Sequence, residues 1–67
     1  MLDISIIEAF RDSLIKNGFR REFIDKLSDI AVLTLYDLWD VEDDEEQITN
    51  VNGFIKEYGF NKEEVFQ

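Results

Sequence analysis

Carboxylates are the side chains through which this sequence could do chemistry, and most of them lie in one short stretch. Seven Asp or Glu residues occur within the ten positions 37–46, and no Lys or Arg interrupts them. Like charges at this density repel one another and have no counterion nearby in the sequence. The stretch is therefore the first candidate for a functional site. Its acids are Asp37, Asp40, Glu42, Asp43, Asp44, Glu45 and Glu46.

Metal binding and hydrolysis are two uses that such acids could have. In a calcium loop, Asp40, Glu42 and Asp44 would take the first, third and fifth positions. The sixth position, however, is Glu45 where these loops have glycine, and the twelfth is Val51 where they have a bidentate acid. A hydrolytic carboxylate pair needs a pocket that separates the two acids electrostatically, and nothing in the sequence predicts one. We expect no metal site.

The residue types that the chain lacks argue against most other catalysis. The 67 residues include no Cys and no His. A Ser-His or Cys-His nucleophile pair, an imidazole base, and the usual zinc and iron-sulfur sites are therefore ruled out. We expect a non-enzymatic protein with no catalytic residue and no cofactor.

Charge is strongly segregated along the chain, whose formal net charge is −9. Residues 1–26 carry five acids and five bases, whereas residues 27–55 carry eight acids and no base. One interpretation is a solvated linker and helix start, since acids interact favourably with the positive end of a helix. The other is a binding face, because carboxylates at helical spacing resemble a phosphate backbone and attract a Lys- and Arg-rich surface. The concentration of the acids in one stretch favours the binding face, since acids scattered over the surface would serve solubility equally well.

Trp39 lies at the margin of the acidic stretch, between Leu38 and Asp40. A ring in this position either closes the core at the end of a helix or anchors an interface surrounded by charge. We include it in the predicted partner-binding set. That set is Asp37, Trp39, Asp40, Glu42, Asp43, Asp44, Glu45 and Glu46.

Two functions follow from these features. The first is an inhibitor or nucleic-acid mimic that occupies the basic surface of a nucleic-acid-binding protein. Phages and mobile elements use proteins of this kind against host defence or regulatory proteins. The second is a self-associating helical adaptor, an antitoxin-like or regulatory subunit that binds through apolar helix faces, which could form a homodimer. Direct binding of nucleic acid is disfavoured by the negative charge.

The elements that would position these residues are helices. Ile4, Ile7, Phe10 and Leu14 follow one another at three- and four-residue steps, which predicts an amphipathic helix that Asp3 could cap. An Asn-Gly pair ends it at positions 17 and 18.

A second apolar pattern runs from about Arg20 to Leu38 and predicts another helix. Its middle, residues 30–36, is also rich enough in branched and aromatic residues for a buried strand, and Thr34 with Asp37 could restart a helix. We favour a helix that could be interrupted near Thr34, because no second strand is available for pairing.

The third helix is expected to start in the acidic stretch and to end as the first one does. Its apolar face includes Val51 and Phe54, and a Gly-Phe pair at positions 59 and 60 repeats the stop at positions 18 and 19. Asn52-Gly53 could kink this helix or end it early. Residues 61–64 have capping-box spacing and predict a short terminal turn.

Together these elements predict one all-α domain over residues 1–67, with three helices and a short fourth C-terminal helical turn. No apolar segment is long enough for a membrane span, so no membrane partner is expected. The start of the sequence has no basic leader before its first acids. We therefore expect a protein of the cytoplasm, of a cell or of an infected host.

Overall fold

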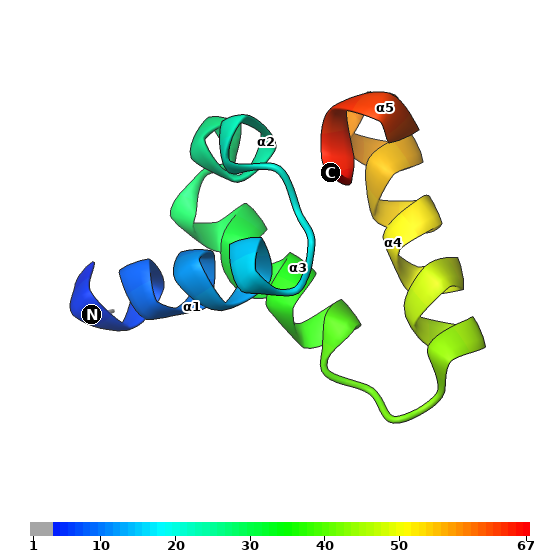
Figure 1. Cartoon of the computed structure of the whole chain (residues 1–67), viewed down its shortest axis with the longest axis horizontal. Coiled ribbons are helices and arrows are strands. Elements are labelled where there is room, and N and C mark those ends of the chain that lie inside the picture. Colours follow the sequence, from blue (N-terminus) through cyan, green and yellow to red (C-terminus); the bar gives the residue numbers. More distant parts are fainter. Residues whose placement is uncertain (1–3) are drawn as a thin grey trace.

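Helices account for all the regular structure in the computed structural model, which describes residues 4–67. The predicted all-α class is confirmed, and in this part of the chain Phe19 and Phe66 form only an isolated bridge rather than a strand. None of the described helices is long and apolar enough to cross a bilayer. Figure 1 shows the helices in chain order: α1 (Ile4–Lys16), α2 (Arg21–Lys26), α3 (Asp29–Trp39), α4 (Asp44–Tyr58) and α5 (Lys62–Val65).

The second predicted helix is divided, but not where we expected. Helix α2 ends before Leu27, and α3 begins after Ser28, whose side-chain oxygen accepts a hydrogen bond from the Ala31 N–H at 3.2 Å. The expected break near Thr34 is wrong, as is the alternative strand, because Thr34 lies inside α3 and its hydroxyl donates to the Ile30 carbonyl at 2.9 Å. Leu27 is buried and fits the apolar periodicity, so the pattern alone conceals the turn at this position.

The two predicted glycine stops are confirmed. Gly18 and Gly59 have φ angles of 111° and 78°. Residues other than glycine adopt such positive φ angles only at a cost in free energy. The N–H groups of Phe19 and Phe60 donate to carbonyls five residues earlier, at 3.2 and 3.0 Å. This is the bond pattern of a Schellman cap, so α1 and α4 end by the same device.

The remaining predictions about helix ends have mixed outcomes. Helix α4 continues through Asn52 and Gly53, so of the two alternatives for this pair the early end is wrong. The capping-box spacing is confirmed, since the Asn61 N–H donates to Glu64 Oε2 at 2.9 Å at the start of α5. Asp3, the predicted cap of the first helix, lies outside the described residues.

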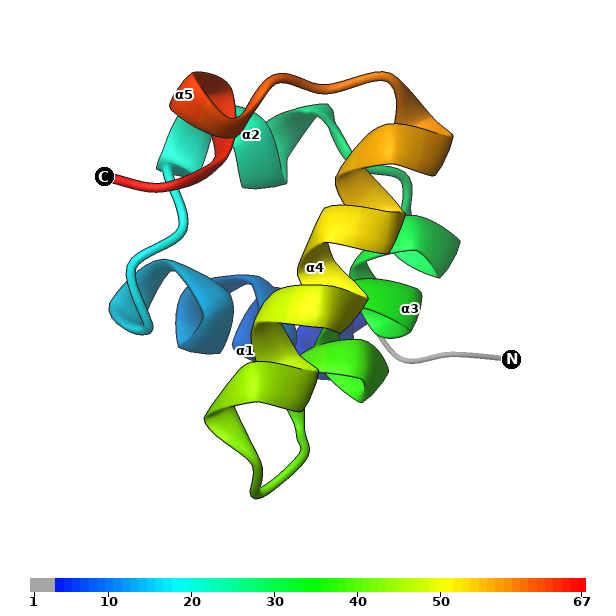
Figure 2. The same ribbon diagram turned by 90° about the vertical axis from the view of Figure 1, so that its right-hand side faces the viewer.

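Phe19 and Phe23 lie at the centre of the core, each no more than 1% exposed. The Phe19 ring lies 6.1 Å from that of Phe23 and 5.0 Å from that of Trp39. Helix α3 packs against both α1 and α4, while α2 packs against α5 on the other side (Figures 1 and 2). The short helices therefore cover a core that the three long helices would leave open.

The end of the chain returns to the α1–α2 connection. The Arg20 N–H donates to the Val65 carbonyl at 2.7 Å, and the Gln67 N–H donates to the Gly18 carbonyl at 2.9 Å. The Phe66 ring packs at 4.9 Å from that of Phe19. These contacts tie α5 to the connection and close one end of the molecule.

Candidate partner-binding surface

The seven predicted carboxylates lie at one end of the molecule, which we call the acidic end. The chain turns there from α3 into α4, and Figures 1 and 2 place this turn at the opposite end from α2 and α5. All seven residues are exposed. Asp37 belongs to the last turn of α3, Asp40, Glu42 and Asp43 lie in the connection, and Asp44, Glu45 and Glu46 form the first turn of α4.

This placement differs from a row of carboxylates along one helix. Only the last three acids, in α4, lie on regular helical backbone one after another. The other four are spread over the end of α3 and the connection, so the negative charge is gathered around a turn. The acidic end is therefore a compact cap of charge rather than a linear strip.

Two amide side chains that the sequence patterns did not single out hold this turn in place. Gln47 Nε2 donates to the carbonyls of Trp39 and Val41, at 2.8 and 3.2 Å. Asn50 Nδ2 donates to the Leu38 carbonyl at 3.0 Å. Both amides come from α4 and donate to two carbonyls in the last turn of α3 and one in the connection, none of which accepts a bond from a helical N–H. In the sequence, Gln47 and Asn50 look like ordinary polar residues on the exposed face of a helix, so nothing predicted this role.

No cation neutralises the acidic end within residues 4–67. The ion pairs of this part of the chain are Arg11 with Asp29, at 3.1 Å, and Lys26 with Glu64, at 3.8 Å. Both lie outside the acidic end. Its carboxylates therefore interact chiefly with solvent and with one another.

Helix dipoles explain only part of the acidic end. Asp43 caps α4 by accepting a hydrogen bond from the Glu45 N–H at 3.0 Å, and acids in the first turn of α4 face the positive end of its dipole. Asp37 and Asp40 instead lie at the C-terminal end of α3, where the dipole is negative and no basic residue is present. A solvated helix start accounts for the acids of α4 but not for these two.

Trp39 belongs partly to the core. Its half-buried ring meets Phe19 edge-on at 5.0 Å and lies 6.4 Å from the Phe66 ring. The indole also borders a surface hollow of about 220 Å³, to which Asp40 and Gln47 contribute. Core packing accounts for the buried part of the ring, and the hollow beside it is also lined by Ser13 and Asn17 of the α1 end.

Metal chemistry receives no geometric support. Across the described chain, no three Asp or Glu side chains are grouped closely enough to hold a metal ion. The crowded acids are all exposed, whereas a cation site requires oxygen ligands that converge on a common point.

The chain was compared with protein-family models, curated proteins and solved structures, and no match was found in any of the three.

Proposed function

We propose that this protein is a non-enzymatic binding module whose acidic end occupies a basic, nucleic-acid-binding surface of a partner protein. Occupation of that surface would exclude the nucleic acid, so the module would act as an inhibitor or mimic. The observation that carries the proposal is the gathering of seven exposed carboxylates at one end, none of which forms an ion pair within residues 4–67. Phage or mobile-element proteins that act against host defence or regulatory proteins in the cytoplasm are the class that fits best.

The physical basis is electrostatic. DNA presents about one negative charge per 1.7 Å of its axis, and proteins that bind it display matching Lys and Arg side chains. A compact cap of carboxylates can satisfy the same cations and steer the encounter. The side chains of Gln47 and Asn50 hold the turn before binding, which lowers the entropy cost of ordering it.

The position of the acids at the end of α3 also supports the proposal. Asp37 and Asp40 are repelled by the negative end of the α3 dipole and by the neighbouring acids. They therefore do not stabilise the chain. Residues that lower stability without a packing role are expected where a function requires them.

A charge-reversal experiment tests the proposal. The triple variant Asp37→Lys, Asp40→Lys, Glu42→Lys changes the net charge from −9 to −3 and leaves the Asp43 cap intact. We expect the wild-type protein, immobilised and exposed to cell lysate at low salt, to capture nucleic-acid-binding proteins, and to displace fluorescent duplex DNA from each captured protein after purification. The variant should lose this displacement by about tenfold or more, because the opposing cations are no longer attracted.

The matched control reverses three exposed acids elsewhere. Glu8→Lys, Asp12→Lys, Asp25→Lys gives the same net charge but leaves the acidic end unchanged. This control should displace the DNA nearly as well as the wild type. Equal losses in the two variants would show that displacement depends only on net charge and would contradict a defined site. Unchanged displacement by the first variant would contradict the proposal outright.

A further inference from the structure

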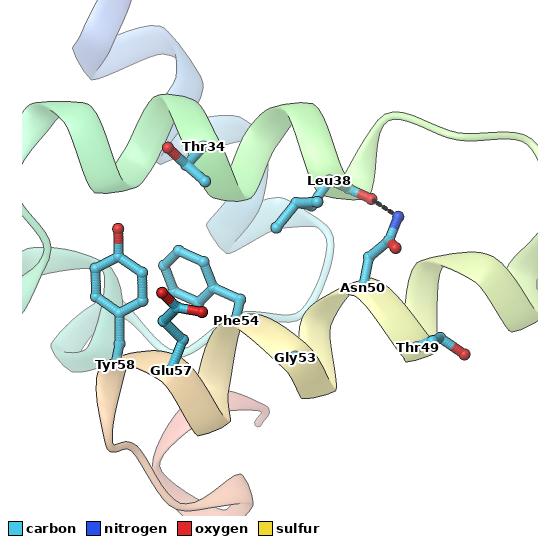
Figure 3. A pocket seen from close by; sticks show the side chains of 8 residues that line it. All are labelled: Thr34, Leu38, Thr49, Asn50, Gly53, Phe54, Glu57 and Tyr58. Carbon is cyan, nitrogen blue, oxygen red and sulfur yellow. Dashed lines mark hydrogen bonds between the residues drawn. The ribbon is translucent and has the colours of Figure 1, made fainter.

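A groove runs between α3 and α4 on the face shown in Figure 3. It has a volume of about 420 Å³ and is partly open to solvent. Phe54 and Leu38 point into it from the two helices, and Asn50 bridges the helices at one end through its bond to the Leu38 carbonyl. Phe54 is 3% exposed, so it forms the floor rather than the rim.

Gly53 lies beside this floor, in the middle of α4, and neither a contact with residues 4–67 nor a positive φ angle requires a glycine there. A Cβ atom at this position would meet no heavy atom within 4 Å, and the backbone has ordinary helical geometry. Glycine inside a helix lowers stability relative to alanine. This glycine lies on the wall of a groove, and no contact or backbone angle requires it. Such a glycine indicates that the backbone of another molecule approaches closely there.

Exposed apolar side chains extend the groove beyond its floor. Ile30, 72% exposed, precedes Thr34 by one turn of α3 and shares its face. At the same end of the groove, Tyr58 is 45% exposed and stacks on Phe54 with a ring separation of 4.2 Å. An apolar strip of this kind on a small monomer is typical of a surface that receives a partner.

Charge determines which partner fits. The groove is lined by Glu57 and by no cation, and its Leu38 end adjoins the acidic end. A second copy of this chain would bring another net charge of −9 against it, so self-association is opposed. A basic segment is attracted by the same field.

We propose that the α3–α4 groove binds an amphipathic α-helix of a partner protein, with apolar residues facing Phe54 and Leu38 and Lys or Arg residues beside them. The partner helix crosses α4 at Gly53, where its backbone approaches most closely. This is helix-in-groove recognition, in which apolar anchors recur at three- and four-residue steps. The inference rests on the groove and does not depend on the function proposed for the acidic end.

A selection experiment with helical peptides tests this proposal and needs no identified partner. A displayed library of such peptides, randomised on one face, is selected against the immobilised full chain. We expect enriched peptides to carry apolar residues at helical spacing flanked by Lys or Arg. Their synthetic versions should shift the backbone amide NMR signals of Thr34, Asn50 and Gly53 on titration.

The decisive variant is Gly53→Leu, which fills the groove from α4. It should weaken binding of the selected peptides by about tenfold or more, whereas its thermal midpoint should be no lower than that of the wild type. Ala9→Leu adds a leucine at an exposed position of α1 and serves as the control, with binding unchanged. Failure to enrich peptides, enrichment of acidic peptides, or equal binding by Gly53→Leu would overturn the proposal. So would light scattering that shows a dimer which Gly53→Leu dissociates.

Discussion

Arg11 joins three segments of the chain through a single guanidinium group. Its Nη1 donates to the Ile24 carbonyl at 2.6 Å, and its Nη2 donates to the Leu27 carbonyl at 2.9 Å and to Asp29 Oδ1 at 3.1 Å. The Arg11 side chain is 14% exposed, so its two bonds to carbonyls are partly shielded from water, whereas the bond to Asp29, whose side chain is 63% exposed, lies in solvent. Arg11 therefore satisfies carbonyls at the turn that separates α2 from α3 and fixes that turn against α1.

Replacement of Arg11 by lysine is expected to destabilise the protein. Lysine keeps the positive charge but cannot present the planar fork that reaches two carbonyls and a carboxylate together. Loss of charged hydrogen bonds in a shielded site should lower the free energy of unfolding by about 1–3 kcal/mol, measured by urea denaturation. The control Arg21→Lys alters an exposed arginine whose side chain forms no hydrogen bond or ion pair with residues 4–67, and a comparable loss there would contradict the specific role of Arg11.

At the scale of elements, helix ends and helix interiors use glycine for different reasons. Gly18 and Gly59 adopt positive φ angles and end α1 and α4, whereas Gly53 lies within α4 and needs no such freedom. The chain therefore contains both kinds of glycine, and the two kinds should respond oppositely to the same substitution.

Alanine substitution at the three glycines should separate these roles. Gly18→Ala and Gly59→Ala are each expected to lower the free energy of unfolding by about 1–2 kcal/mol, the cost of a side chain in left-handed backbone. Gly53→Ala should raise it by about 0.5–1 kcal/mol. Thermal and urea unfolding followed by circular dichroism measure all three, and a loss of stability in Gly53→Ala would show that this glycine has a structural purpose after all.

Across the whole molecule, the excess negative charge is concentrated at the acidic end. Helices α2 and α5, far from that end, carry three bases and four acids and are close to neutral. The molecule measures 31 × 24 × 21 Å, comparable with the Debye length of about 30 Å at 0.01 M salt. At low ionic strength the acids of the acidic end therefore all repel one another. At about 1 M salt the Debye length falls to about 3 Å, and the salt screens most of this repulsion.

Salt should stabilise the free protein for this reason. Urea unfolding is suitable because urea carries no charge, and the free energy of unfolding is expected to rise by on the order of 1 kcal/mol between low and high sodium chloride. The triple variant at Asp37, Asp40 and Glu42 should be more stable than the wild type at low salt, because lysine suits the negative end of α3, and should respond less to salt. A salt response equal to that of the wild type would show that the acidic end is not the source of the repulsion.

Local sequence patterns alone predicted most of the helices and how they end. The Gly-Phe pairs, the capping box that begins at Asn61, and the start of α4 in the acidic stretch all follow from interactions within a few residues, which is why they were predictable. The turn at Leu27 was not, since a buried leucine satisfies the helical pattern whether or not the backbone continues.

The residues of the acidic end were also predictable without a fold, because charge and proximity along the chain can be recognised in the sequence. The packed helices were needed to show that these acids surround a turn, that Gln47 and Asn50 hold this turn, and that Gly53 faces an open groove. Those features arise where α3 and α4 pack side by side, and contacts between helices depend on crossing geometry that local periodicity does not encode.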